Sequence, residues 1–126
     1  MRINLLWMVL GVVVGSAATY ALAQTPTATY RVPQFENGDV KVWKTVILPK
    51  SPLSMHRHEH GRALVALKGG QVTIQNDKGK KTPVVWETGK AYWLDADPPG
   101  NEQHADVNEG TDPIEVIVVE LKNDRK

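Results

Sequence analysis

The chain has 126 residues and a formal net charge of +1, and 41% of its residues are hydrophobic. This length suits one domain, and the near balance of charge argues against nucleic acid or an acidic membrane surface as the main partner, because both need a basic excess. There is no cysteine, so a bound metal would be held by nitrogen and oxygen rather than sulfur.

Residues 1–23 predict an export signal. A basic Arg2 precedes an almost wholly apolar run at 3–15, and Ala21-Leu22-Ala23 forms an A-x-A site with cleavage expected after Ala23. The alternative is an uncleaved anchor facing the periplasm, because about 20 apolar residues can span a bilayer. Cleavage removes Arg2 from the 15 basic residues and leaves 14 of them against 14 acidic ones. We therefore expect a periplasmic or secreted protein, with no membrane contact after cleavage.

The first part of the exported chain is expected to be a leader followed by a hairpin. Residues 24–34 are rich in Thr, Ala and Pro, and we expect this leader to pair weakly or not at all. Asn37-Gly38 is a strong hairpin signal, and the strand-forming run 40–48 follows it. Pro52 then predicts a loop or sheet edge just before a group of histidines.

The rest of the chain alternates short strand patterns with turns. Strands are expected at residues 64–67, 71–75, 80–86, 90–94, 103–107 and 114–121. No sustained helical period appears, and turn signals recur about every 8 to 12 residues, which is typical of an all-β sandwich or barrel. The domain is expected to cover residues 35–121, and the charged tail 122–126 is expected to fray.

The histidines are concentrated in two places. Three of the four, His56, His58 and His60, alternate along one stretch, and on an extended strand such side chains leave from the same face. The fourth, His104, lies in a later predicted strand. Neutral imidazole is the commonest metal ligand in proteins. His56 and His58 are therefore the natural pair of ligands, and His104 is the third.

The spacing of these residues resembles the two sequence motifs of the cupin superfamily. In the first motif, H-x-H is followed after three or four residues by Glu and after six more by Gly. In the second, Gly precedes P-x-G, His and Asn. The matching residues here are His56, His58, position 62 and Gly69, then Gly89, Pro98, Gly100, His104 and Asn108, with a longer run before the proline and one extra residue before the histidine.

The resemblance implies an all-β cupin-type jelly-roll barrel, or double-stranded β-helix. It also implies a divalent metal ion (Fe, Mn, Ni, Cu or Zn) held by His56, His58 and His104, and a homodimer. Position 62 departs from the family pattern, because Arg62 stands where Glu is usual and has no lone pair for a metal. The fourth ligand is therefore open.

Three compensations for Arg62 are considered. His60 could complete an all-nitrogen ligand set, or lie exposed or beside the ligands. Glu102, two residues before His104, could supply the missing carboxylate, or be an ordinary solvated loop residue. Arg62 could instead receive an anionic ligand that bridges it to the metal, which is the interpretation we favour. Trp93, close to the second motif, is a candidate wall of the ligand pocket.

The other large aromatic residues, Trp43, Trp86 and Tyr92, are expected in the core. Trp93 is expected there too if it does not line the pocket. Asn108 is expected to close a turn with its side chain.

We predict an exported small cupin that binds a divalent metal and a small anionic ligand. The alternative is a metal-dependent oxidoreductase, similar to a dioxygenase, or an isomerase acting on a small organic acid or aromatic substrate. Because one fold supports many functions, the resemblance does not choose between them.

Overall fold

The computed structural model describes residues 24–125, and within them it contains eight strands and no helix. The strands are β1 (Tyr30–Glu36), β2 (Val40–Ile47), β3 (Arg62–Lys68), β4 (Gly70–Asn76), β5 (Lys81–Trp86), β6 (Ala91–Leu94), β7 (His104–Asn108) and β8 (Ile114–Leu121). A search of the described residues for membrane-crossing helices found none. The predicted export signal at 1–23 lies outside the described residues.

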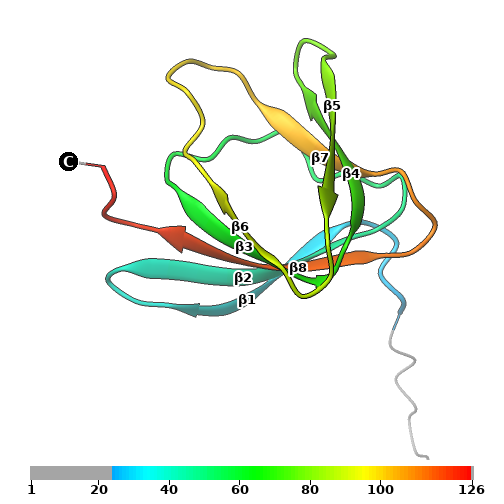
Figure 1. Cartoon of the computed structure of the whole chain (residues 1–126), viewed down its shortest axis with the longest axis horizontal. Coiled ribbons are helices and arrows are strands. Elements are labelled where there is room, and N and C mark those ends of the chain that lie inside the picture. The colour runs from blue at the N-terminus through cyan, green and yellow to red at the C-terminus, as the bar shows by residue number, and fades with distance from the viewer. Residues whose placement is uncertain (1–23, 126) are drawn as a thin grey trace, which may run out of the picture.

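The strands form two antiparallel sheets that face each other around one interior (Figure 1). The larger sheet has the order β1-β2-β8-β3-β6, and the smaller has the order β5-β4-β7. Both sheets draw together strands that are distant in sequence, such as β2 with β8 and β4 with β7. The predicted all-β barrel is confirmed.

Alternation along each strand decides which side chains face the interior. On β8, Ile114, Val116 and Val118 are buried while the residues between them are partly exposed. On β3, Arg62, Leu64 and Ala66 are buried in the same way. The period of two is what a half-buried strand requires. It places an arginine in the buried row of β3.

The core is made of the two inward faces. Trp43 and Trp86 are buried in it, and Tyr92 packs against it, as expected for these aromatic residues. Trp93 is 56% exposed, so the expectation of a core position is wrong there. It is adjacent in sequence to Tyr92, and neighbouring side chains on a strand point to opposite faces.

The expectation that the leader pairs weakly is wrong at its end. Tyr30–Glu36 forms β1 and pairs along its length with β2, beginning with Tyr30 opposite Val46. Pro33 is tolerated there because β1 is the edge strand of its sheet and needs to donate on one side only. The Asn37 side chain closes the β1–β2 turn by accepting hydrogen bonds from the backbone of Asp39 and Val40, at 2.8 and 2.9 Å.

The charged tail is held rather than frayed over residues 122–125. The Lys122 backbone N–H donates to the Asp39 carbonyl at 2.9 Å, and the Asn123 side chain donates to the Gly38 carbonyl at 2.9 Å. Both partners belong to the β1–β2 turn. The expectation failed because these partners are more than 80 residues away in sequence and become neighbours only in the folded chain.

Candidate metal centre

The histidine stretch is not the continuous strand that its alternation predicted. Its regular pairing is confined to His56, which forms an isolated antiparallel bridge with His104. Each of these residues donates its backbone N–H to the carbonyl of the other, at 2.9 and 2.8 Å. This bridge anchors the stretch to β7, so that two histidines from one motif meet one from the other.

Three imidazoles come together at this bridge. Ring centroids lie 5.0 Å apart for His56 and His58, 4.8 Å for His56 and His104, and 5.5 Å for His58 and His104. One nitrogen from each ring lies within 4.8 Å of the other two, which makes these residues a group able to hold a metal ion. The described residues thus place the predicted ligands together.

The His56 ring has one nitrogen occupied and one free. Its Nδ1 lies 2.9 Å from the Ser54 carbonyl, which can only accept, so Nδ1 carries the proton. Its Nε2 is buried and has no hydrogen-bond partner among the described residues. A buried acceptor left without a partner is costly, whereas a metal bond would satisfy it. The donor set therefore fits a metal ion.

The other two rings are oriented by carboxylates. His58 Nδ1 lies 3.1 Å from a carboxylate oxygen of Glu120, and His104 Nδ1 lies 3.5 Å from one of Asp97. The same Asp97 carboxylate accepts the His58 backbone N–H at 2.6 Å. Outer partners of this kind fix the tautomer and turn the second ring nitrogen toward a metal.

Both histidines of the first motif are held in the neutral form. Burial lowers the pKa of His58 to about 2, helped by the positive charge of Arg62, and burial also lowers the pKa of His56. The contact between His58 and Glu120 is therefore a neutral N–H donating to a carboxylate rather than an ion pair. Because a metal ligand must be unprotonated, protons compete weakly for these nitrogens at neutral pH.

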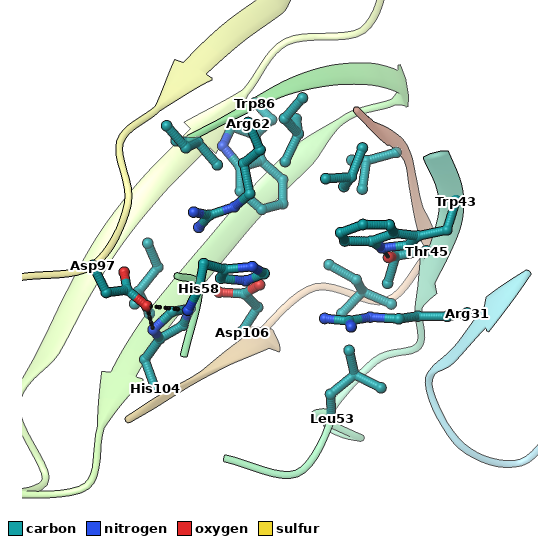
Figure 2. Close-up of a pocket in the computed structure, with 16 residues that line it drawn as sticks. Arg31, Trp43, Thr45, Leu53, His58, Arg62, Trp86, Asp97, His104 and Asp106 are labelled. Carbon is teal, nitrogen blue, oxygen red and sulfur yellow. Dashed lines mark hydrogen bonds and ion pairs between the residues drawn. The ribbon is translucent and has the colours of Figure 1, made fainter. Parts of the chain in front are cut away.

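A cavity of about 150 Å³ lies beside the histidines, inside the barrel (Figure 2). Its charged and ionisable lining consists of Arg31, His58, Arg62, Asp97, His104 and Asp106. The rest of the lining is largely apolar and includes Trp43 and Trp86. The candidate metal site therefore borders an interior space that is lined by charges of both signs.

Arg62 is a buried wall of this cavity, with 8% of its surface exposed. Its guanidinium donates to the Asp95 carbonyl at 3.1 Å and forms no ion pair with any described residue. Burial lowers the pKa of Arg62, and the nearby carboxylates Asp97, Asp106 and Glu120 oppose this shift. Arg62 thus faces the cavity, as the interpretation of an anion-binding arginine requires.

His60 lies apart from the group of three. Its Nδ1 lies 2.5 Å from one oxygen of Asp124, while the other oxygen of Asp124 accepts the Gly61 backbone N–H at 2.7 Å. The ring of Trp93 covers Gly61 so closely that an added Cβ would lie 2.5 Å from it. The tail residue Asp124 therefore stabilises the turn that connects His58 to Arg62, and His60 contributes one of the two contacts.

The change Asp124→Asn tests whether these contacts of Asp124 stabilise the turn. An amide offers only one oxygen, so it cannot keep both acceptor bonds to the turn. We expect a lower midpoint of thermal unfolding and a metal affinity reduced by less than the roughly tenfold typical of direct partners of a ligand. Calorimetric metal titration measures the second effect. Asp39→Asn, a matched change in the β1–β2 turn, should alter neither, and an equal effect of the two variants would contradict the role of Asp124.

Glu102 and Trp93 also lie outside the group. Glu102 accepts from the Asn76 side chain at 3.0 Å and lies 3.5 Å from the Lys78 ammonium. The Trp93 indole N–H donates to Asp95 at 2.8 Å, and its ring does not line the cavity. Among the compensations for Arg62 predicted from the sequence, the arrangement favours the anion over a fourth ligand from His60 or Glu102.

Four residues of the site were not predicted: Arg31, Asp97, Asp106 and Glu120. A sequence signal existed for two of them. Glu120 continues the inward row of β8, and Asp106 follows His104 by two positions on β7, so each is an acid in a row facing the interior. Arg31 lay in the supposed leader, and Asp97 lies in an irregular loop without a period.

An all-β barrel with three converging imidazoles, one buried and two partly buried, defines a candidate metal-binding barrel protein. No family model and no curated protein matches the chain. Solved structures do. A cupin domain from Bordetella pertussis is 19% identical, with a TM-score of 0.65 over 79% of this chain and 98% of its own.

Two further structures agree with it. A double-stranded β-helix protein from Klebsiella pneumoniae is 17% identical, with a TM-score of 0.59 over 82% of this chain and 84% of its own. A cupin superfamily protein from Desulfitobacterium hafniense is 13% identical, with a TM-score of 0.56 over 79% and 83%. At these identities the likeness establishes the fold. The chain has the cupin fold that its motif residues predicted.

Proposed function

We propose that the chain binds a divalent metal ion on His56, His58 and His104 and holds the acid group of a small ligand between this ion and Arg62. The observation that carries the proposal is the position of Arg62. Its guanidinium is buried in the cavity wall without an ion pair among the described residues. A buried charge is costly unless it is paired, and a carboxylate can take two parallel hydrogen bonds from arginine.

The charges around the cavity support a ligand with one negative charge. With a divalent ion, the site would hold four positive charges, two on the metal and one each on Arg31 and Arg62. The surrounding carboxylates Asp97, Asp106 and Glu120 supply three negative charges. One monoanion would complete the balance. A cavity of about 150 Å³ admits only a small group, which suits a carboxylate head.

The protein's own residues would prepare the site for this ligand. Glu120 and Asp97 orient two of the imidazoles, and Arg62 would align the plane of the carboxylate. Three nitrogen ligands leave positions open on the ion, which would supply a Lewis acid and, for iron, manganese or copper, redox chemistry. Imidazole nitrogen suits Fe, Ni, Cu and Zn, whereas Mn, the fifth ion that the resemblance implies, prefers oxygen ligands. Export and a homodimer are part of this proposal; export rests on the sequence of residues 1–23, and the homodimer rests on the resemblance to cupins.

One observation favours the alternative function, a metal-dependent oxidoreductase or isomerase. The carboxylate of Asp106 lines the same cavity and forms no hydrogen bond or ion pair with any other described side chain (Figure 2). A carboxylate without a fixed partner beside a metal site can accept a proton from a bound substrate. Asp106 is the residue on which turnover of a small organic acid would depend.

The change Arg62→Gln tests the proposed anion site. We expect it to weaken acetate binding by about tenfold or more, because a hydrogen bond to a charged group contributes about 1.5–3 kcal/mol. Protein loaded with Co²⁺ and titrated with acetate reports binding through the visible spectrum of the ion. An unchanged affinity for acetate in the Arg62→Gln protein would overturn the anion site.

A second change in the same cavity should have the opposite effect on acetate affinity. Asp106→Asn removes one negative charge and preserves the shape of the side chain, so acetate should bind more tightly. Loss of affinity in both variants would indicate general damage to the cavity, whereas opposite changes would support electrostatic recognition of an anion.

A further inference from the structure

A second, larger cavity lies on the outer side of the histidines. It measures about 420 Å³ and is formed by β1, the start of β2 and the histidine stretch. We call it the outer groove; its lining is Arg31, Pro33, Gln34, Phe35, Glu36, Lys41, Val42, Trp43, His56, Arg57, His58 and Glu120. Seven of these residues were not part of the site described above, namely Pro33, Gln34, Phe35, Glu36, Lys41, Val42 and Arg57.

The outer groove and the inner cavity meet at the candidate metal centre. Arg31, Trp43 and His58 line both spaces, and Figure 2 shows these three from the side of the inner cavity. Of these two spaces, His56 lines the groove and His104 lines the inner cavity. A metal held by all three histidines would therefore lie at the boundary, within reach of a ligand that occupies both spaces.

The groove presents an apolar wall with an exposed aromatic ring. Pro33, Phe35, Val42 and Trp43 contribute to this wall, and Phe35, the only phenylalanine of the chain, is 59% exposed. The pairing of β1 with β2 shifts register between Pro33 and Phe35. A bulge of this kind redirects side chains and is common beside binding sites. Here it accompanies an aromatic side chain that lines the groove.

Free positive charges complement this wall. Neither Arg31 nor Lys41 forms an ion pair with a described residue, and the Arg31 guanidinium lies 5.0 Å from the centre of the Trp43 ring. Of the negative groups in the groove, Glu36 is paired with Lys122 at 2.8 Å, whereas Glu120 accepts from the neutral His58 ring at 3.1 Å and keeps its charge. The two unpaired cations, Arg31 and Lys41, outnumber this one carboxylate. The available charge in the groove therefore attracts an anion and disfavours a cation.

We infer that the ligand is an aromatic carboxylic acid whose ring occupies the outer groove against Phe35 while its acid group lies at the metal and Arg62. Size supports this division. The inner cavity is smaller than the roughly 300–1,000 Å³ typical of small-molecule sites, whereas the groove falls within that range. A ligand larger than its acid head must extend into the groove. The inference rests on the proposed function and specifies its ligand class.

The test compares phenylacetate with acetate on Co²⁺-loaded protein. Both acids have the same head group, and only phenylacetate carries a ring. We expect phenylacetate to bind about tenfold more tightly, because burial of a ring contributes on the order of 1.4 kcal/mol, which is tenfold in affinity. Phe35→Ala should remove most of this gain and leave acetate binding within about twofold.

Controls separate this inference from the proposed function. Val85→Ala, at a valine of the smaller sheet that is 60% exposed, should change neither affinity. Arg62→Gln should weaken both acids equally. If acetate binding depends on Arg62 but phenylacetate binds no more tightly, the aromatic ligand is wrong and the anion site stands. If phenylacetate binding depends on Phe35 and not on Arg62, the ring is in the groove but the anion site is wrong. If neither acid binds, both are wrong.

A second copy of the chain is the competing occupant, because β1 is an edge strand. In that case phenylacetate would bind no more tightly than acetate. Phe35→Ala would weaken the dimer, and the molecular mass measured in solution would fall toward that of one chain. That result would overturn the ligand assignment of the groove.

Discussion

Replacing His58 with alanine is expected to abolish binding of a divalent metal ion. His58 is the most deeply buried of the three imidazoles, with 7% exposure, and of the three it is the one that lines both cavities. Two remaining histidines cannot reproduce a set of three fixed nitrogens, so we expect affinity to fall by more than the roughly hundredfold upper limit for changes in outer partners. Calorimetric titration of metal-free protein with Zn²⁺ measures this loss, and elemental analysis after dialysis checks it independently.

Two further variants should lose less Zn²⁺ affinity than His58→Ala. Glu120→Gln removes the carboxylate that accepts from His58 Nδ1, and it should lower Zn²⁺ affinity by about tenfold. His60→Ala removes a histidine two positions away that contacts Asp124 instead of the group, and it should lower affinity by less than tenfold. Should His60→Ala prove as damaging as His58→Ala, the assignment of the ligands would be wrong.

The fold could be predicted because its signals are local. Turn residues such as Asn37-Gly38 determine where strands end, and the period of two along 114–121 determines which side of the last strand is buried. The intervals between the motif residues also predicted which distant segments lie close together. His56 and His104 meet through a backbone bridge that no local rule contains, yet the cupin spacing anticipated their meeting.

The details of the site could not be predicted because they depend on contacts between distant segments. His60 has the same spacing as the two ligands, and only the position of Asp124 shows why it turns away. The direction of Arg62 follows from the register of β3 against β8, where it lies opposite Glu120. A sequence gives the period of a strand but leaves open which strands are its neighbours. The outer groove was missed for the same reason, since it needs β1 in place.

Gly69 offers the largest expected effect on folding. It follows β3 directly, and its backbone N–H donates to the Thr88 hydroxyl at 2.9 Å. A Cβ added there would collide with the carbonyl oxygen of Trp86 and lie 2.8 Å from the Thr88 backbone nitrogen. Because both obstacles are backbone atoms, no rotation of a side chain relieves them. Gly69→Ala should therefore lower the free energy of unfolding by about 3 kcal/mol, the upper range for overpacking.

Urea unfolding of Gly69→Ala and of a matched control measures this effect. Gly38→Ala adds the same methyl group where nothing lies within 4 Å, so its free energy of unfolding should stay within about 0.5 kcal/mol of the original chain. Equal unfolding midpoints for the two variants would contradict the close approach of the strands at Gly69. Trp86 lines the inner cavity, so a displaced backbone there should also weaken acetate binding. The glycine of the first motif thus acts through space, by allowing the link between β3, which carries Arg62, and β4 to pass close to the end of β5, which carries Trp86.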